Sequence, residues 1–204
     1  MASFGDNFNR ADENPLSGGG NWTAQGAGRD HQIVSNAVEA TAIGSGKESC
    51  VTTGITGTSK NFAWCRVGTL TGNVSGNNVG VYLRAADPGT RSFYRFSADN
   101  PTTKGSFITI AAAGSDTDLA TETSTSWASG NIVEARALDT NLELWRNGTK
   151  LLSTTDATYS SGRQGIKVFA STDLSEAVLD DFYGGDMPAF TIGSGIGGWR
   201  SMIG

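Results

Sequence analysis

Acidic side chains are the first candidates for chemistry in this chain, because hydrolysis of a glycosidic bond needs two carboxyl groups beside that bond. The sequence offers two groupings, Asp116/Asp118/Glu122 and Asp180-Asp181. Loop residues interrupt the first grouping, which is typical of a solvated loop. The two members of the second are adjacent, and adjacent residues of a strand point to opposite faces of a sheet. We therefore predict no catalytic residue.

Metal binding and proton transfer have equally few candidates. His31 is the only histidine, and its position beside Asp30 before an expected strand favours a surface or structural role. No Cys-x-x-Cys pattern occurs, so no zinc site is expected. Asp180 and Asp181 have the oxygen ligands that a structural Ca²⁺ prefers, but hydrogen bonding to the N-terminal strand is the simpler interpretation. We predict no metal site and no cofactor.

Two cysteines lie on consecutive expected strands, Cys50 in ESCVTTGI and Cys65 in FAWCRVG. Adjacent strands could bring the two thiols close, so a disulfide is possible. We favour the alternative of two reduced, half-buried thiols.

Short strands separated by turn signals must position all of these residues. Asn147-Gly148 lies between LELWR and TKLLSTT, and this pair favours the type I′ turn of a β-hairpin. No stretch has a sustained 3.6-residue period, so almost no helix is expected. We expect strands near residues 4–8, 32–41, 50–56, 61–70, 78–86, 92–98, 106–112, 131–138, 142–146, 149–154, 165–170 and 177–183.

Alternation along four of these strands turns aromatic and charged side chains outward, where a simple sandwich has polar residues. A core position for Leu142 and Leu144, for example, turns Trp145 outward. Phe107 has the same expected orientation. The candidate binding residues on the outer face are Tyr82, Arg84, Trp145 and Phe169. Three interpretations stay open: a protein interface, a sugar-stacking platform, and core positions after a one-residue register error.

The C-terminal tail, residues 187–204, differs from the domain at 1–186. Pro188 stops a continuing strand, and apolar residues then alternate with many glycines. The tail is either a lightly packed terminus or, as we favour, an arm that docks on a partner. Its candidate docking residues are Phe190, Ile192, Ile196, Trp199 and Met202.

Composition excludes some partners. The formal net charge is −5, and the sequence has no basic stripe to replace phosphate counterions, so no nucleic acid is expected. No apolar run is long enough for a membrane span. The N-terminal residues lack the basic and apolar regions of a secretory signal.

Two segments resemble a known family. The first runs from WASG through LELWRNG and SSGRQGI to VLDDF, and the second is the opening FGDNFNRADENPLSGGGNWT. Both are similar to the concanavalin A-like (LamG-type) jelly roll, over about residues 4–186. The resemblance implies an all-β fold, a single jelly-roll sandwich of two antiparallel sheets, followed by the extended Gly-rich tail. Glucanases of this family carry Glu-x-Asp-x-Glu on one strand, and this chain has no such triplet.

Members of this family bind sugars, hydrolyse them or serve as structural modules. We expect a non-catalytic virion module, a phage capsid decoration (cement) protein or surface appendage. Its partners would be other virion proteins, of the capsid or tail, and further copies of itself. The expected location is the virion, made in the host cytoplasm, or a secreted location if the initial Met was added. The alternative function is a carbohydrate-binding lectin domain with glycan partners, and a weaker third is a hydrolase.

Overall fold

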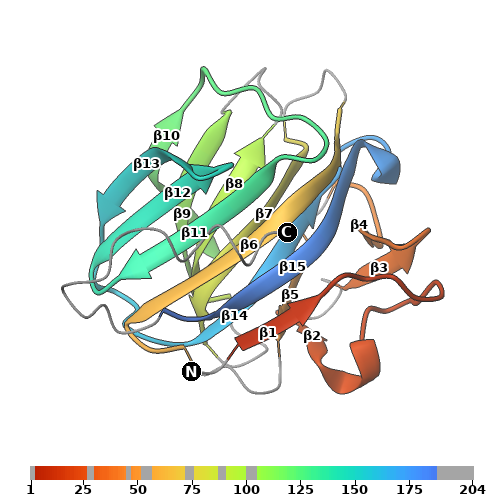
Figure 1. Ribbon diagram of the computed structural model, residues 1–204, viewed down its shortest axis with the longest axis horizontal. Coiled ribbons are helices and arrows are strands. Elements are labelled where there is room, and N and C mark those ends of the chain that lie inside the picture. Colours follow the sequence, from red (N-terminus) through yellow and green to blue (C-terminus); the bar gives the residue numbers. More distant parts are fainter. Residues whose placement is uncertain are drawn as a thin grey trace.

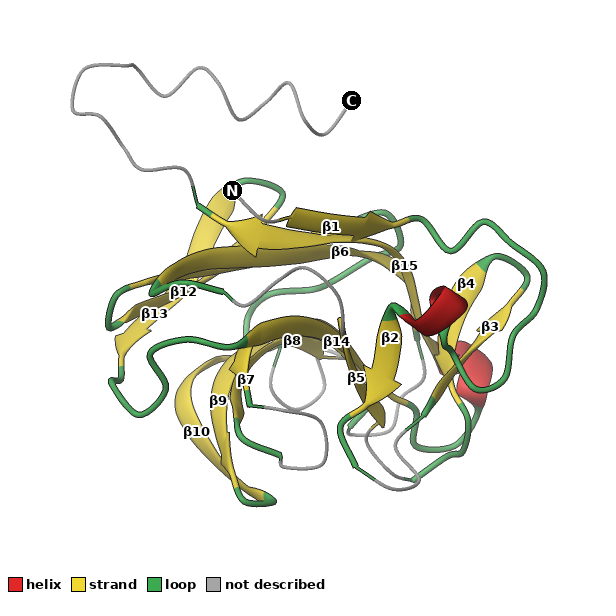
Figure 2. Ribbon diagram, turned by 90° about the horizontal axis from the view of Figure 1, so that it is seen from below, coloured by secondary structure: helices red, strands yellow, loops and turns green. Residues whose placement is uncertain are grey.

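Two antiparallel β-sheets pack face to face (Figure 2). The computed structural model describes residues 3–26, 30–44, 47–51, 57–71, 76–86, 91–99 and 105–187. Its helical segments are two short 3-10 turns, η1 (Gly18–Gly20) and η2 (Leu174–Glu176). The expected all-β jelly-roll sandwich of two antiparallel sheets is therefore confirmed. No helix among the described residues is long and apolar enough to cross a membrane.

The eight-stranded sheet faces the viewer in Figure 1 and has the order β13-β12-β11-β6-β15-β4-β3, with β1 paired to β15. The seven-stranded sheet behind it has the order β10-β9-β8-β7-β14-β5-β2. The strands are β1 (Ser3–Asp6), β2 (Trp22–Ala24), β3 (His31–Val34), β4 (Ala37–Ala40), β5 (Lys47–Val51), β6 (Lys60–Leu70), β7 (Asn78–Ala85), β8 (Phe93–Asp99), β9 (Ser106–Ala112), β10 (Ser115–Glu122), β11 (Ile132–Leu138), β12 (Asn141–Arg146), β13 (Thr149–Thr155), β14 (Arg163–Phe169) and β15 (Ala177–Asp186).

The hydrophobic core lies between the sheets and follows the period of two along the strands. On β12 it takes Leu142 and Leu144, and on β14 it takes Ile166 and Val168, all four fully buried. Their neighbours along each strand therefore point to the outer faces, as the alternation predicts.

Turn chemistry explains two hairpins. Asn147 and Gly148 have φ angles of 49° and 80°, so the predicted turn between β12 and β13 is confirmed. The single strand expected over 32–41 is wrong, because Ser35 and Asn36 have φ angles of 53° and 65° and divide it into the β3–β4 hairpin. Both turns require the left-handed backbone region that Asn and Gly tolerate best.

The two cysteines lie in different sheets. Cys50 is on β5 of the seven-stranded sheet, and Cys65 is on β6 of the eight-stranded sheet. Cys65 is a free thiol, and complete burial raises its pKa well above the ordinary value. The two strands are consecutive in the sequence, as expected, but they are not neighbours in one sheet.

We predict that Gly80→Ala strongly destabilises the fold. A Cβ at Gly80 would lie 2.2 Å from the carbonyl oxygen of Phe96 on β8, an atom fixed by the sheet. The free energy of unfolding, measured with urea, should fall by more than about 2 kcal/mol.

Gly68→Ala is the matched control, because Gly68 also lies within a strand. The closest atoms to its added Cβ are a methyl of Val178, at 3.1 Å, and the Val178 carbonyl oxygen, at 3.2 Å, and a shift of a few tenths of an ångström relieves both contacts. Its loss should stay below about 1 kcal/mol. Equal losses in the two variants would contradict the close approach of β7 to β8.

Candidate functional site

Side chains on the outer face of the eight-stranded sheet form a row that crosses five strands. The strand register places them directly opposite one another, Trp145 against Glu134 and Glu134 against Trp64. We call this set the outer row, and in order across the sheet it consists of Lys150, Trp145, Glu134, Trp64 and Tyr183. Directly paired residues of neighbouring strands are close enough for their side chains to interact.

Trp64 and Tyr183 form an aromatic platform at one end of the outer row. Their ring centres are 6.3 Å apart, with the planes inclined by 31°, and both side chains are half-buried. Phe62 packs against the other side of Tyr183, at 5.9 Å. Gly5 is paired with Tyr183, and a Cβ there would lie 2.8 Å from Tyr183 Cδ2. Because Gly5 has no side chain, the Tyr183 ring can lie over β1 at this position.

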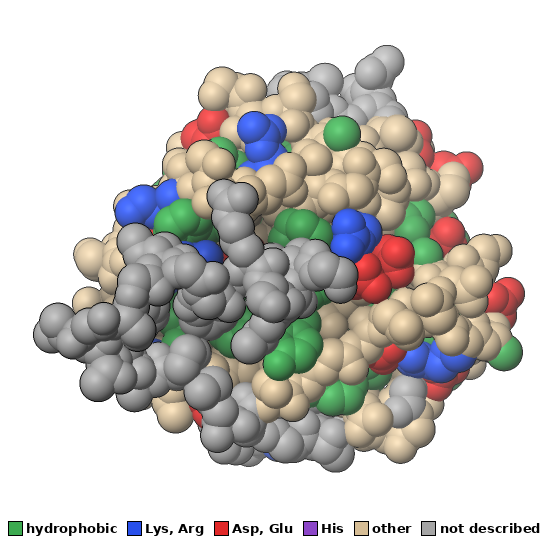
Figure 3. Space-filling view, in the orientation of Figure 1, with side chains coloured by type: hydrophobic (Ala, Val, Ile, Leu, Met, Phe, Trp, Pro, Cys, Tyr) green, Lys and Arg blue, Asp and Glu red, His purple; other side chains and the backbone are tan. Residues whose placement is uncertain are grey.

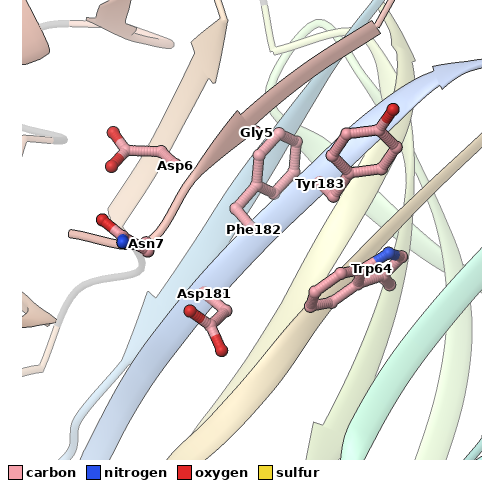
Figure 4. Close-up of a pocket in the computed structure, with 7 residues that line it drawn as sticks. All are labelled: Gly5, Asp6, Asn7, Trp64, Asp181, Phe182 and Tyr183. Atoms are coloured by element: carbon pink, nitrogen blue, oxygen red, sulfur yellow. The ribbon is translucent and has the colours of Figure 1, made fainter. Parts of the chain in front are cut away.

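A shallow depression of about 460 Å³ opens beside this platform (Figure 4). The two rings lie on one side of it, and polar side chains lie on the other. It is lined by Gly5, Asp6, Asn7, Trp64, Asp181, Phe182 and Tyr183. Apolar surface with a few fixed polar groups is the usual composition of a small-molecule site.

Of the two carboxylates that line the depression, Asp6 is committed to the fold. Its oxygens accept hydrogen bonds from the Phe8 N–H (2.9 Å), from Arg10 Nη1 (2.7 Å) and from Trp22 Nε1 (2.8 Å). Asp181 has a single such partner, Arg66, whose Nε donates to Oδ2 at 2.8 Å. The Asp181–Arg66 pair is therefore the charged group that can meet a ligand here.

A β-bulge places Asp181 at the depression. The register of β15 on β6 shifts between Asp180 and Phe182, and Asp181 has a φ of 47°. Our prediction that Asp180 and Asp181 point to opposite faces is therefore wrong, because the extra residue interrupts the alternation. Both lie near Arg66. Burial raises the pKa of the Asp180 carboxyl, and the charge of Asp181 adds to this effect.

The far end of the outer row is a rigid polar cluster around Trp145. The Arg136 guanidinium lies 4.0 Å from the centre of the Trp145 ring, and its Nε donates to Glu134 at 2.7 Å. Glu143 accepts hydrogen bonds from Trp145 Nε1 (3.0 Å) and Lys150 Nζ (3.3 Å). Burial alone would raise the pKa of Glu143, but these bonds and that from Asn141 outweigh it and lower the pKa. The cluster is therefore fixed and charged.

The four predicted outer-face residues do not form one site. Trp145 lies on the outer face of the eight-stranded sheet, as predicted. Tyr82 and Phe169 lie on the outer face of the seven-stranded sheet, on the opposite side of the molecule. Tyr82 is nevertheless fully buried and stacks on Phe93, with ring centres 4.7 Å apart.

The outward position predicted for Arg84 is wrong. Arg84 is 1% exposed, with a φ of 57°, at a bulge where β7 has one residue more than β14. Its guanidinium turns inward and donates to the backbone carbonyl oxygens of Ser59, Asp139 and Tyr159, at 2.6–2.8 Å. Arg84 is a structural residue that joins three segments.

Two further expectations concern residues of the seven-stranded sheet, Asp116 and Phe107. Asp116 is not in a solvated loop: it lies on β10, and Arg91 and Arg95 donate to it at 3.0 Å. Burial would raise the pKa of Asp116, but the two guanidinium groups outweigh this and lower it. Phe107 does face outward, yet it is only 4% exposed, with Arg95 over its ring at 5.3 Å.

Other predictions concern metal binding and the tail. Among the residues that the structure describes, no group of three or more His, Cys, Asp or Glu side chains could hold a metal ion. His31 is fully buried at the start of β3, in a structural role. The tail residues Phe190, Ile192, Ile196, Trp199 and Met202 lie outside the described part of the chain. Their docking role stays a prediction.

Solved structures with a similar fold identify the fold class of this chain. The carbohydrate binding module CBM66 from Bacillus subtilis has a TM-score of 0.62 at 10% identity, over 79% of this chain and 91% of the module. The exoplasmic/lumenal domain of VIP36, in a Ca²⁺/mannose-bound form, has a TM-score of 0.59 at 14% identity, over 88% of this chain and 90% of that domain. The fold is a concanavalin A-like jelly roll.

A third similar structure comes from endo-acting O-glycanases of gut bacteria that initiate mucin breakdown. It has a TM-score of 0.57 at 9% identity and covers 91% of this chain and 99% of its own. No protein-family model matches the sequence, and no curated protein matches it either. The similar structures thus include carbohydrate-binding domains and a chain described together with O-glycanases.

Sequence reasoning missed Trp64, Tyr183, Arg66 and Asp181 as members of one site. Alternation along FAWCRVG does signal that Trp64 and Arg66 share the outer face, because Ala63, Cys65 and Val67 have a core pattern. No local signal places Tyr183 beside Trp64, since their strands are separated by most of the chain.

We predict that Asp180→Asn makes the fold more stable at neutral pH. The raised pKa of Asp180 means that ionisation costs more in the folded than in the unfolded chain. Stability is therefore lost as the pH rises from below the ordinary value of 3.8 through the folded pKa. The asparagine still accepts the Asp181 N–H but cannot ionise. The gain, measured by urea unfolding, should be below about 1 kcal/mol at pH 7, because solvent screens a partly exposed group, and it should vanish at acidic pH.

Asp181→Asn is the control, because it removes the partner of Arg66. It should not stabilise the protein at neutral pH. A gain for Asp181→Asn, or no difference between Asp180→Asn and the parent at any pH, would contradict the described electrostatics.

Proposed function

We propose that this chain is a non-catalytic carbohydrate-binding domain that holds a glycan at the Trp64–Tyr183 platform. The observation that carries the proposal is the composition of one open depression, with two aromatic rings beside an ion-paired carboxylate. The similar carbohydrate-binding structures agree with it, although a shared fold alone does not fix a function.

The chemistry of sugars explains why these groups suit a glycan. A pyranose has an apolar face of C–H groups that packs on an aromatic ring, and a rim of hydroxyls that donate and accept hydrogen bonds. Trp64 and Tyr183 offer the rings, each with a polar atom at its edge. Asp181 offers an acceptor, and Arg66 has donors beyond the Nε that binds Asp181.

Hydrolysis is less well supported than binding. A glycosidase needs two carboxyl groups facing the same bond. Two carboxyl groups line the depression, those of Asp6 and Asp181. Asp6 accepts hydrogen bonds from three donors within the fold, so only Asp181 can face a substrate there. Asp180 does not line the depression, and its Oδ1 accepts the Asp181 N–H at 2.8 Å.

The virion role that we expected first gains no support from the similar structures named above, which are carbohydrate-binding domains and a chain from glycanases. The virion location, the capsid partners and the self-association stay predictions. We therefore prefer the carbohydrate-binding alternative.

The test is a glycan array probed with the full chain, followed by calorimetric titration of the glycans that bind. Trp64→Ala should weaken binding at least tenfold, equivalent to about 1.4 kcal/mol. It should leave cooperative unfolding intact, because Trp64 lies on the outer face. Product analysis of the same mixtures should show no shortened glycan.

Phe169→Ala is the matched control, a half-buried aromatic side chain on the opposite sheet. It should leave affinity unchanged. No glycan bound above background would overturn the proposed function. Loss of binding in Phe169→Ala but not in Trp64→Ala would move the site to the other sheet. Turnover that Asp181→Asn abolishes would make the protein an enzyme.

A further inference from the structure

The outer row has a second contact region at a fixed distance from the platform. Trp145 on β12 and Trp64 on β6 are both paired with Glu134 on β11, the strand between them. Neighbouring strands are about 4.8 Å apart, so the two tryptophans are anchored about 10 Å apart across the sheet. The two-sugar repeat of an extended, β-linked glycan is of similar length, so one sugar can lie at Trp64 and the second sugar after it at Trp145.

The groups at Trp145 suit hydroxyl recognition. The Arg136 guanidinium lies over the indole ring, with Cζ 4.0 Å from the ring centre, and is ion-paired with Glu134, yet its side chain stays 27% exposed. A guanidinium has five N–H donors, and only Nε is used by Glu134. A planar donor group in a fixed position loses little conformational entropy when it binds.

Charge along the outer row is balanced pair by pair. Beside or within the row, the cations Arg66, Arg136 and Lys150 have the ion-pair partners Asp181, Glu134 and Glu143 respectively. Asp180 adds a further carboxyl group beside Arg66, so these groups leave no excess of positive charge. In Figure 3 acidic, basic and hydrophobic side chains are interspersed over the coloured part of this face. A site for carboxylated or sulfated sugars would instead need cations in excess. The balance favours an uncharged glycan.

The depression lies on the open face of the sheet and not in an enclosed cavity. A ligand can therefore continue from the platform along the outer row towards Trp145. From these observations we infer that the outer row binds a stretch of an uncharged, extended β-linked glycan. The glycan lies across the strands, with one contact at Trp64–Tyr183 and a second at Arg136–Trp145. This inference rests on the proposed function.

The experiment is calorimetric titration of the full chain with β-1,4-linked gluco- and manno-oligosaccharides, from disaccharide to hexasaccharide, and with polygalacturonate as an acidic comparison. In at least one neutral series affinity should rise about tenfold or more once the oligosaccharide spans both contacts. Trp145→Ala should abolish that rise with length. Trp64→Ala should weaken every length.

Arg136→Gln is the second variant, in case Trp145→Ala unfolds. It removes the guanidinium and should also abolish the rise with length. Affinity that is independent of length, or unaffected by both variants, overturns the second contact but leaves glycan binding at Trp64 intact. Binding restricted to acidic or α-linked glycans on the array overturns the assigned ligand class. The absence of all glycan binding overturns the proposed function itself.

Discussion

The carboxylate of Asp6 is the interaction on which this end of the sandwich depends. Three donors converge on it: the Phe8 N–H, Arg10 and the indole N–H of Trp22. Phe8 has a φ of 54°, a conformation that costs free energy for an aromatic residue, and the Asp6 bond helps to hold it there. Trp22 is thereby placed against Phe182 of the closing strand, with ring centres 5.1 Å apart. These contacts fix β1 beside β15, and so the platform tyrosine rests on an ordered strand.

Two bulges decide which side chains become functional candidates. On β7 an extra residue turns Arg84 into the molecule, where it binds three carbonyl groups. On β15 an extra residue brings Asp181 to Arg66 on the outer face. Without the extra residues, Arg84 would point to the outer face and Asp181 into the core. The bulge on β7 therefore removes a predicted binding residue, and the bulge on β15 adds a carboxylate at the depression.

The sequence predicts the fold better than the site, because the fold depends on repeated local signals. Asn147-Gly148 and the alternation in LELWR predict a hairpin and an outward Trp145, and both are observed. The outer row depends instead on the pairing of β6 with β15, and no local pattern records that register. A bulge also leaves no clear local mark, which explains the errors at Arg84 and Asp181. Alternation also does not report exposure: Tyr82 lies on an outer face, as predicted, but neighbouring side chains bury it completely.

The place of β15 in the eight-stranded sheet has a consequence for how the chain is made. This strand pairs with β6, β4 and β1, and its Asp181 meets Arg66 across 115 residues of sequence. During synthesis β1 and β6 leave the ribosome long before the strand that joins them. Until then their backbone donors and acceptors are unpaired edges that another nascent chain can pair with. Pairing of this sheet is therefore a late event, which makes the newly synthesised chain most vulnerable to aggregation before β15 has left the ribosome.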